Sequence, residues 1–542
     1  MSGVPAVVIA APASGSGKTT LATGLIGALR RAGHRVAPFK VGPDYIDPGY
    51  HGLAAGRPGR NLDPVLVGAE RVVPLYRHGA HGCDLAVVEG VMGLFDGRID
   101  ENHAAPIAEG STAQVAGLLG APVILVVDAR GHSQSLAALL HGFATFDTAI
   151  SLGGVILNRV GSERHDQVLR AACDRVGLPV LGSLPRMAEL EVPSRHLGLI
   201  PAVEHGHAAT AAVEAMTDLV AAHVDLLTIA RLARSTIAAP AWDPATAIRE
   251  FEDSVYANSV AAASVDEAIA TDVTSAFSGA SRSNAQAGAS TAGVASAGVG
   301  DRARAADAVA ERASRAMPTA AQGPVVSGVV TEAALGPVIA MAGGAAFTFG
   351  YAEHRELLEA AGARVVIFDP LRDELPTGTA GLVLPGGFPE EHAAALAAND
   401  RLLAQVAEQA GAGLPVHAEC AGLLYLSRSL DGHSMAGVVD ATAEFGPRLT
   451  LGYRDAVALA DSALWRAGER VRGHEFHRTR LVSTGDHATA WGWHTAGERI
   501  REGALIHRVH ASYLHTHPAG NPGATTRFVA AAAQYAQSRA TI

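Results

Sequence analysis

Residues 6–33 read AVVIAAPASGSGKTTLATGLIGALRRAG, which is an apolar run, a loop of small residues and a longer amphipathic stretch. This order predicts a strand, a phosphate-binding loop and a helix. The loop APASGSGKTT, residues 11–20, departs from the strict pattern because Pro12 stands six residues before Lys18, where a glycine is expected. The flanking strand and helix favour a nucleotide site all the same.

The residues of this loop have separate predicted roles. Gly15 and Gly17 allow positive φ and a close backbone approach, so amide groups at the start of the helix face the phosphates. Lys18 reaches the β- and γ-phosphates, Thr19 ligates Mg²⁺, and Thr20 belongs to the same nucleotide-binding set. We therefore expect ATP and Mg²⁺ at this loop.

Lysine is scarce in this chain. Lys18 and Lys40 are its only lysines, and arginine supplies the other 40 of the 42 basic side chains. A compact ammonium group fits a tight phosphate loop better than a planar guanidinium group. The positions of the two lysines therefore indicate the nucleotide site, where Lys40 can neutralise charge on a transferred phosphoryl group. Codon bias in a GC-rich genome explains the scarcity of lysine but not these positions.

Composition narrows the class of protein. A chain of 542 residues is long enough for two domains, and a formal net charge of −11 argues against a nucleic-acid partner and for a small-molecule substrate. Three cysteines are too few for a disulfide framework, and no apolar segment is long enough to span a bilayer. We expect a cytoplasmic protein with no membrane partner; the sequence leaves a homodimer open.

Apolar, β-branched runs alternate with amphipathic stretches over residues 1–234 and again over 337–542, which predicts two α/β domains with parallel sheets. The expected strands are residues 6–11, 84–90, 122–129, 153–160 and 179–185, then 337–343, 364–370, 381–387 and 414–420. Residues 235–336 are rich in Ala, Ser and Gly and predict a flexible linker. An Ala-rich helix at 306–316 is the alternative.

Four acidic residues follow the ends of predicted strands. They are Asp44 and Asp47 in PFKVGPDYIDPGYH (38–51), and Glu89 and Asp96 in VVEGVMGLFDG (87–97). The carboxyl ends of parallel strands meet at one edge of a sheet, where Mg²⁺–ATP needs hard oxygen ligands. We expect Asp44 and Glu89 to ligate the metal with Thr19. Each acid alone could be a solvated turn residue, but four in two loops make that explanation weak.

A second site is predicted around Cys420. In VHAECAGLLYL (416–426) an apolar strand ends at this cysteine and a Leu-rich stretch follows, the strand–turn–helix pattern of a nucleophile elbow. The amide of Ala421 is then available to an oxyanion, and Gly386 and Gly387 of LPGGFPE (384–390) can complete the oxyanion hole.

A thiol in such a turn needs a base, and the candidates are His515 and His517 of ASYLHTHPAGNP (511–522). The segment GHEFH (473–477) lacks the histidine spacing of a zinc helix, so we assign it a structural or substrate-shaping role. Cys83 and Cys173 lie outside any such turn and are expected to be structural.

Taken together, these motifs resemble the cobyrinic acid and hydrogenobyrinic acid a,c-diamide synthase family of cobalamin biosynthesis. The resemblance covers nearly everything except the linker. The matching segments are APASGSGKTT, PFKVGPDYIDPGYH, NLDP (61–64), VVEGVMGLFDG, LPRMAELEVPSRHLGLIPA (184–202), AAFTFGYAEHRELLEAAGA (345–363), LPGGFPEEH, AECAGLLYL, GHEFH and SYLHTH.

The resemblance implies a dethiobiotin-synthetase-like P-loop domain followed by a flavodoxin-like class I glutamine amidotransferase domain. It implies that Cys420 is the nucleophile and His515 its activating base. Members of this class usually read His-x-Glu at that point. Here His517 occupies the glutamate position, which leaves open what orients His515.

The implied reaction uses both sites. ATP converts a corrinoid acetate into an acyl phosphate, and ammonia released from glutamine at Cys420 displaces the phosphate. The expected substrate and phosphate contacts are Asp44, Tyr45, Asp47 and Asp96. By family analogy the c acetate is amidated before the a acetate.

Three other functions compete with this one. A cobyric acid synthase shares both domain types, and a Ni-sirohydrochlorin a,c-diamide synthase performs near-identical chemistry. A partition-type P-loop ATPase, the non-enzymatic alternative, would carry a second lysine early in its loop and would not need Cys420. The Arg- and Ala-rich composition suggests an organism with a GC-rich genome, in which the aerobic route that inserts cobalt late is the commoner one. This favours the metal-free substrate, hydrogenobyrinic acid, over cobyrinic acid.

Overall fold

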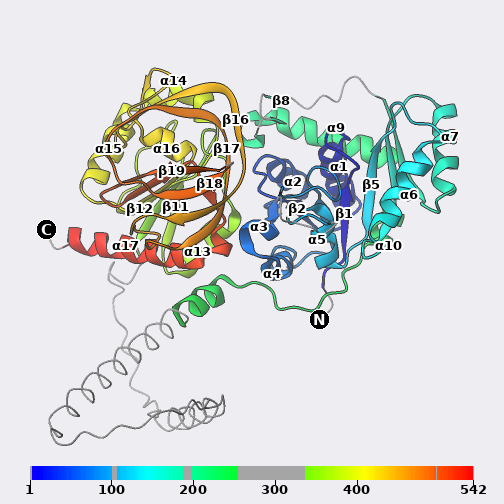
Figure 1. Ribbon diagram of the computed structural model, residues 1–542, viewed down its shortest axis with the longest axis horizontal. Helices are drawn as coiled ribbons and strands as arrows, with labels where there is room; N and C mark the ends of the chain where they lie inside the picture. Colours follow the sequence, from blue (N-terminus) through cyan, green and yellow to red (C-terminus); the bar gives the residue numbers. More distant parts are fainter. Residues whose placement is uncertain are drawn as a thin grey trace, which may run out of the picture. The chain divides into compact units, whose positions relative to one another are not determined.

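The computed structural model of the protein describes residues 3–99, 107–186, 194–195, 198–199, 201–253, 336–495 and 497–540. Met1–Glu252 and Leu335–Ile542 form one compact unit, which contains both predicted α/β domains (Figure 1). Residues 306–316 and most of 187–200 lie outside the described residues.

A parallel sheet forms the first domain, with the strand order β3-β2-β4-β1-β5-β6-β7 over the described residues. The strands are β1 (Ala6–Ala10), β2 (Val36–Val41), β3 (Arg60–Leu62), β4 (Leu85–Glu89), β5 (Val123–Asp128), β6 (Leu152–Val160) and β7 (Val180–Pro185). The five strands predicted here are all present. Residues of β2, which contains Pro38, and of the short β3 were not predicted as strands.

Helices flank this sheet. They are α1 (Lys18–Arg31), α2 (Asp47–Ala55), α3 (Pro64–Val67), α4 (Ala69–Gly79), α5 (Thr112–Leu119), α6 (Leu136–Phe146), α7 (Glu163–Asp174), α8 (Ala202–His205), α9 (His207–His223) and α10 (Leu226–Leu232), with a two-stranded ribbon of β8 (Ser194–Arg195) and β9 (Gly198–Leu199). Helix α1 packs closely on α9: a Cβ on Gly24 would lie 2.4 Å from the carbonyl oxygen of Met216. Gly24 therefore allows α1, the helix that follows the phosphate loop, to approach α9 closely.

The beginning of the predicted linker packs on the first domain. The indole of Trp242 is buried, and its backbone amide donates to the carbonyl of Pro74 over 2.9 Å. Ile248 is buried in the same core. The linker prediction overlooked these apolar side chains, which give residues 236–253 surface to bury; residues 254–335 lie outside the described part.

The second domain contains a sheet ordered β11-β10-β12-β13-β21-β20, parallel except for β20. Its strands are β10 (Val338–Ala342), β11 (Arg364–Phe368), β12 (Thr379–Leu384), β13 (Val416–Glu419), β20 (Ala504–Ile506) and β21 (Val509–Ser512). The four strands predicted in this domain are confirmed. β11 is the edge strand, and β12 and β13 lie inside the sheet and carry the candidate segments 384–390 and 416–426.

A largely antiparallel sheet was not predicted. It consists of β14 (Ser429–Leu430), β15 (His433–Ser434), β16 (Ala441–Ala458), β17 (Arg470–Thr484), β18 (Trp491–Thr495), β19 (Glu498–Glu502) and β22 (His515–Thr516). The pairing of β16 with β17 shifts register near Pro447, between Phe445 and Thr450. Bulges of this kind break the strict alternation from which strands are predicted.

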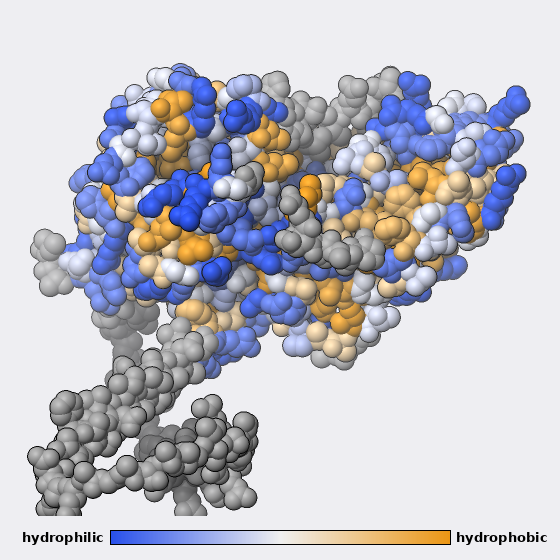
Figure 2. Space-filling view, in the orientation of Figure 1, coloured by the Kyte–Doolittle hydropathy of each residue, from blue (hydrophilic) through white to orange (hydrophobic). Residues whose placement is uncertain are grey.

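The second domain also contains helices α13 (Ala352–Ala360), α14 (Ala393–Ala398), α15 (Asp400–Gly411), α16 (Ala421–Leu426) and α17 (Pro522–Ala540), and the 3₁₀ turns η2 (Pro389–His392) and η3 (Pro518–Gly520). Helices α13 and α17 lie side by side (Figure 1). On the face shown in Figure 2, hydrophobic residues are interspersed with hydrophilic ones. Among the described residues, none of the helices is both long and apolar enough to cross a membrane.

Side chains of the two domains contact each other within this unit. Arg60 lies 2.6 Å from Glu353, and the hydroxyl of Tyr453 donates to Asp63 over 3.0 Å. Both acids are buried. The contact between the domains therefore includes specific polar pairs as well as apolar surface.

Candidate functional site

The phosphate loop joins β1 to α1. Gly15 and Gly17 have φ values of 78° and 92°, so the expected positive φ is confirmed at both. Gly17 is the N-cap of α1, and no side chain caps the first amides of the helix. A Cβ on Gly15 would meet nothing within 4 Å. Uncapped amides beside open space suit a phosphate.

Two residues at the end of β6 hold this loop from the side. Asn158 donates to the carbonyl of Ser16 over 2.9 Å, and Arg159 donates to the carbonyl of Gly15 over 2.9 Å. Arg159 also bonds Asp128 over 2.5 Å and has a positive φ of 60°. The sequence predicts this segment only as a strand, because no local pattern indicates contact with a loop 142 to 144 residues earlier.

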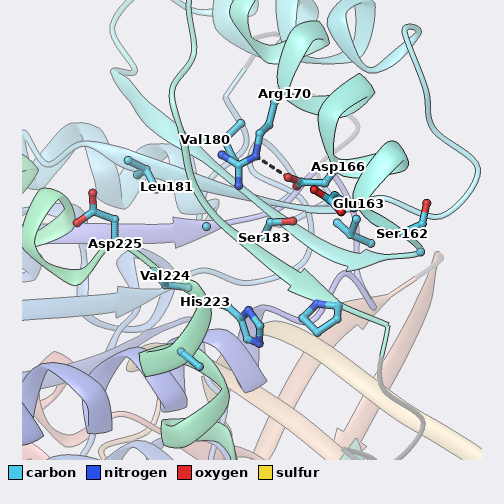
Figure 3. Close-up of a pocket in the computed structure, with 15 residues that line it drawn as sticks. Ser162, Glu163, Asp166, Arg170, Val180, Leu181, Ser183, His223, Val224 and Asp225 are labelled. Atoms are coloured by element: carbon cyan, nitrogen blue, oxygen red, sulfur yellow. Dashed lines mark hydrogen bonds and ion pairs between the residues drawn. The ribbon is translucent and has the colours of Figure 1, made fainter.

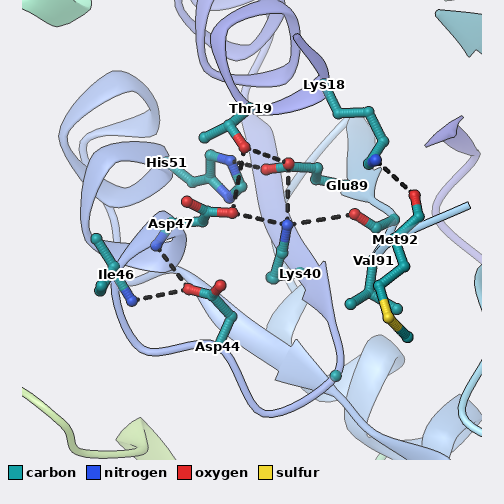
Figure 4. A network of polar contacts seen from close by, with 12 residues as sticks. Lys18, Thr19, Lys40, Asp44, Ile46, Asp47, His51, Glu89, Val91 and Met92 are labelled. Atoms are coloured by element: carbon teal, nitrogen blue, oxygen red, sulfur yellow. Dashed lines mark hydrogen bonds and ion pairs between the residues drawn. The ribbon is translucent and has the colours of Figure 1, made fainter. Parts of the chain in front are cut away.

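A buried ion network lies beside the loop (Figure 4). The ammonium of Lys40 is 2.7 Å from Asp47 and 2.9 Å from Glu89. The hydroxyl of Thr19 donates to Glu89 over 2.7 Å and to Asp47 over 3.2 Å. His51, which was not predicted, lies 2.7 Å from the second oxygen of Glu89. The ends of β2 and β4, together with α1 and α2, thus bring an ammonium, an imidazole, a hydroxyl and two carboxylates together.

Charge within the network is balanced by its members. Burial opposes ionisation of Glu89, but Lys40, His51 and Thr19 outweigh it and lower the pKa of Glu89 to about 2. Burial, with Asp44 nearby, raises the pKa of Asp47 to about 6. Burial also works against the charge on Lys40, yet the two carboxylates raise its pKa above the usual value. An ammonium group therefore already neutralises this acidic pocket.

Two of the predicted acids stabilise loops. One oxygen of Asp44 accepts from the amides of Ile46 and Asp47 over 2.8 and 2.9 Å, so Asp47 rather than Asp44 contacts Thr19. Asp96 accepts from the amide of Gly93 over 3.0 Å. Their roles in phosphate, substrate or metal binding stay predictions, as does that of Thr20 in the first turn of α1.

Lys18 is held by backbone oxygens rather than by an acid. Its ammonium donates to the carbonyl of Met92 over 2.5 Å and approaches that of Ala13 at 3.5 Å. Met92 has a positive φ of 44°, unusual for a residue with a side chain. Burial and the nearby Lys40 lower the pKa of Lys18. Neutral contacts of this kind leave its charge available to an anion.

The thiol lies at a sharp turn. Cys420 directly follows β13 and has φ and ψ of 48° and −97°, and a Cβ on Gly422 would lie 2.2 Å from the carbonyl oxygen of Leu384. Burial, together with Glu390, raises the pKa of the Cys420 thiol well above its usual value, and the Ala421 amide works in the opposite direction. The predicted elbow geometry is confirmed.

His515 lies against Gly386, one of the predicted oxyanion residues. A Cβ on Gly386 would be 2.3 Å from Cε1 of His515, and one on Gly387 would be 2.2 Å from the carbonyl oxygen of Ala346. Only glycines fit at these two positions. The structure therefore brings the predicted base and one predicted oxyanion residue together, while their catalytic roles stay predictions.

Glu419 faces His515. Its Oε2 lies 3.7 Å from Nδ1 of the ring, and its Oε1 accepts from the amide and hydroxyl of Thr516 over 3.0 and 2.9 Å. His417 lies 3.2 Å from the same oxygen. Glu419 was not predicted as a site residue, although it directly precedes Cys420. Its place before the nucleophile was the available signal.

His517 has a different environment. Its Nδ1 accepts from the amide of Ala519 over 3.2 Å, which caps the turn η3, and its ring lies 4.1 Å from that of Tyr351. Burial lowers the pKa of His517 to about 4. His517, at the position where a glutamate is usual, thus stabilises the turn η3.

The remaining sequence candidates are packed. His477 of GHEFH lies on Tyr513 with ring centres 3.9 Å apart, and His474 is buried. Cys173 is buried and Cys83 half-buried. Within the described part of the chain, no cluster of three or more His, Cys, Asp and Glu side chains is arranged to hold a metal ion.

An open hollow of about 800 Å³ lies along β7, between α7 and the end of α9 (Figure 3). Its lining includes Arg170 and Asp166, which bond over 2.7 Å, and His223. Among the described residues, those of the ion network and the thiol turn do not line it. The hollow begins at Val160, next to the residues that hold the phosphate loop.

Comparison with known proteins assigns both domains. Residues 7–200 match the CobQ/CobB/MinD/ParA nucleotide binding domain, and residues 338–522 match the CobB/CobQ-like glutamine amidotransferase domain. Hydrogenobyrinate a,c-diamide synthases of Mycobacterium tuberculosis (strain H37Rv) and Streptomyces coelicolor are 55% and 53% identical to the chain, over 98% and 97% of both sequences. A cobyrinate a,c-diamide synthase of Synechococcus sp. is 33% identical over 98% of both.

The fold and its sites thus define a class, in which a P-loop nucleotide domain is joined to a glutamine amidotransferase domain. Within that class, the chain belongs to the hydrogenobyrinate and cobyrinate a,c-diamide synthase family.

Proposed function

We propose that this chain catalyses the ATP- and glutamine-dependent amidation of the a and c acetates of hydrogenobyrinic acid in cobalamin biosynthesis. The observation that carries the proposal is the presence of a phosphate site and a thiol site in one chain that is 55% identical, over 98% of its length, to a hydrogenobyrinate a,c-diamide synthase. Such a reaction takes place in the cytoplasm, where both co-substrates are found.

The names of the relatives favour the metal-free substrate. Those that are 45–55% identical to this chain are hydrogenobyrinate a,c-diamide synthases. Cobyrinate a,c-diamide synthases of Synechococcus sp. and Syntrophotalea carbinolica are 33% and 36% identical. A closely related hydrogenobyrinate enzyme supports the same assignment here.

The phosphate site is suited to activating a carboxylate. Bound ATP supplies the phosphoryl group, and a corrinoid carboxylate attacks its γ-phosphorus to give an acyl phosphate and ADP. Lys18 and the uncapped amides of α1 hold the phosphates, and Lys40 neutralises charge on the transferred group. Thr19, with Glu89 and Asp47 beside it, offers the oxygen ligands that Mg²⁺ prefers, and Mg²⁺ would neutralise phosphate charge there.

The thiol site is suited to releasing ammonia. His515 takes the thiol proton, Cys420 sulfur attacks the amide carbon of glutamine, and the C–N bond breaks as His515 returns the proton to the leaving ammonia. Amides of Gly386 and Ala421 stabilise the oxyanion. Water then hydrolyses the thioester to glutamate, while ammonia attacks the acyl phosphate and displaces phosphate.

Glu419 orients the base in this scheme. Its carboxylate is fixed by Thr516 at one oxygen and faces His515 Nδ1 at 3.7 Å with the other. His417 and His515 hold its pKa well below the usual range against the effect of burial. A fixed negative charge beside Nδ1 stabilises the imidazolium that forms when the thiol is deprotonated. Glu419 thus takes the part that a glutamate two residues after the histidine has in the usual pattern.

Mass spectrometry tests the function directly. The protein is incubated with Mg²⁺–ATP and glutamine, and with hydrogenobyrinic or cobyrinic acid in parallel, and the amides on each corrinoid are counted. We expect two amides on hydrogenobyrinic acid, each accompanied by one glutamate and one ADP. No amide on either corrinoid while ATP is still hydrolysed would reject the proposal. A sedimentation measurement on the same sample tests for a homodimer.

A further inference from the structure

Tyr45 belongs to the nucleotide domain but packs into the amidotransferase domain. It lies in the loop between β2 and α2, and its side chain is buried. Its ring stacks on Phe349, with centres 4.9 Å apart and planes at 12°, and lies 5.1 Å from Tyr351. The ring of His515, the proposed base, is 5.2 Å away. A residue of the first domain therefore forms part of the wall of the thiol site.

The same loop reaches the phosphate site. Two residues after Tyr45, Asp47 binds Lys40 at 2.7 Å and accepts from Thr19 at 3.2 Å. The loop is braced on both sides of Tyr45. Asp44 accepts from the amide of Asp47 over 2.9 Å, and the side chain of Asn61 donates to the carbonyl of Asp44 over 2.7 Å. The loop that carries Tyr45 is thus tied by hydrogen bonds to Asp47 of the phosphate site.

Phe349 links Tyr45 to Gly386, one of the predicted oxyanion residues. The amide of Phe349 donates to the carbonyl of Gly386 over 3.0 Å, and Gly386 lies directly against Cε1 of His515. Neither ring nitrogen of His515 has a hydrogen-bond partner among the described residues. The imidazole is therefore held by packing and by the more distant Glu419, and the packing includes Tyr45.

We propose that Tyr45 is a positioning residue that couples occupancy of the phosphate site to glutamine hydrolysis. The proposal rests on the proposed function. A ligand at Thr19 competes for the hydroxyl that now contacts Asp47, so the braced loop shifts and Tyr45 moves against His515 and Phe349. Hydrolysis is then fast only when nucleotide occupies the phosphate site, so little ammonia is released while no ATP is present to activate an acceptor. The sequence analysis placed Tyr45 only among substrate contacts.

The test compares Tyr45→Ala and Tyr45→Phe with the wild-type protein. A diazo-ketone analogue of glutamine alkylates Cys420, and intact-mass spectrometry gives the rate with and without Mg²⁺–ATP. We expect Mg²⁺–ATP to accelerate alkylation of the wild type by about 5- to 150-fold, the usual range of coupling between sites. Tyr45→Phe keeps the ring and should keep this ratio, whereas Tyr45→Ala should bring it close to one.

A matched control is Tyr453→Phe, which removes a hydroxyl that bonds Asp63 across the same domain contact. It should retain the acceleration. Ammonia-dependent amidation, which bypasses the thiol, should stay within a few-fold of wild type in Tyr453→Phe. If Tyr45→Ala does not fold, Tyr45→Leu removes the ring while keeping apolar volume, and the same loss of acceleration is expected.

Several results would overturn the proposal. They are an unchanged ratio in Tyr45→Ala, an equal loss in Tyr453→Phe, a wild-type ratio of one, and a collapse of ammonia-dependent amidation in Tyr45→Ala. The last would make Tyr45 a substrate contact instead. Failure of the wild type to amidate hydrogenobyrinic acid with ammonia would reject the proposed function, whereas the alkylation ratio with Mg²⁺–ATP alone judges Tyr45 separately.

Discussion

The phosphate site and the thiol site treat charge in opposite ways. In the first, Lys40 is buried with Asp47 and Glu89, and each charge has a partner within 3 Å. In the second, burial keeps the Cys420 thiol protonated, and the nearest charged partner of His515 among the described residues is an acid at 3.7 Å. The nucleotide domain is thus charged and compensated before any ligand binds. The amidotransferase domain holds its nucleophile neutral, so its chemistry needs a base that removes the thiol proton.

Removing the thiol should separate the two sites most strongly. Cys420→Ser should lower the glutamine-dependent rate by about 10⁴-fold or more, as expected when a nucleophile is lost, because the hydroxyl of serine is a poor substitute for a thiolate. The rate with ammonium chloride should be unchanged. Amide formation by mass spectrometry measures both. Cys173→Ala, at a buried cysteine outside the turn, is the control, and equal loss of both rates in Cys420→Ser would contradict the division of labour.

The reverse separation should follow from changing Lys40. Lys40→Met leaves Asp47 and Glu89 buried without their cation, so both the glutamine- and the ammonia-dependent rates should fall, by about 10²–10³-fold. The loss of one partner of a buried pair should also cost about 3–5 kcal/mol of stability, measured by urea unfolding. Adding Glu89→Gln should restore part of the stability but no activity.

An exposed ion pair provides the control for Lys40. Arg31→Met removes a partner of Asp218 on the surface, where both side chains are more than half exposed, and should leave rates and stability nearly unchanged. If Lys40→Met were as mild as Arg31→Met, the compensated-charge description of the phosphate site would be wrong.

The sequence predicted the elements that depend on short-range pattern. The parallel strands, the positive φ of Gly15 and Gly17, and the turn at Cys420 follow from residue type and local order. The linker prediction overlooked Trp242, because composition over 100 residues hides one large apolar side chain at its edge.

What the sequence could not give were contacts across long separations. Asn158 on the phosphate loop, His51 on Glu89, and Tyr45 against His515 each join segments that no local pattern links. Glu419 was adjacent to Cys420, but its role is visible only once β13 and β22 bring Thr516 and His515 beside it. The antiparallel sheet was missed because bulges interrupt its alternation.

A smaller and more specific effect is expected at Glu419. Glu419→Gln keeps an oxygen that can accept from Thr516 but removes the charge that faces His515. The kcat for glutamine hydrolysis should therefore fall by roughly 10²-fold, which is part of what general-base catalysis contributes. KM and the ammonia-dependent rate should change little. Glu419→Asp should recover part of the loss.

Glu502→Gln is the matched control for Glu419, because Glu502 is a half-buried acid that accepts from Ser512 over 2.7 Å beside the same sheet. It should leave kcat within a few-fold of wild type. A rise in KM for glutamine without a fall in kcat in Glu419→Gln would mean that Glu419 binds glutamine rather than orienting the base.

Acid should affect the two domains unequally. Burial lowers the pKa of His354, His474 and His510 to about 3 and that of His517 to about 4, against about 6.5 in an unfolded chain. Each therefore contributes stability that is present above pH 6.5 and is lost as the pH falls towards 4, because the unfolded state takes up the proton first. The cost is about 1.4 kcal/mol per histidine and pH unit in that window.

Carboxyl groups with raised pKa values act in the opposite direction in both domains. Burial raises the pKa of Asp63 in the nucleotide domain to about 6, and that of Glu390 and Glu502 in the amidotransferase domain to about 7, which offsets part of the loss from the four histidines. The pKa of Asp47 is raised to about 6, so its native form takes up a proton more readily than the unfolded chain, and its contribution to stability grows as the pH falls from 6 towards 4. Hydrogen exchange followed by domain between pH 7 and 5 should therefore show protection lost first around β13, β17 and β21, all in the amidotransferase domain. His510→Gln removes one titrating group and should reduce the pH dependence there. Earlier loss in β1 and β4 would mean that the buried ion network, rather than the buried histidines, limits stability in acid.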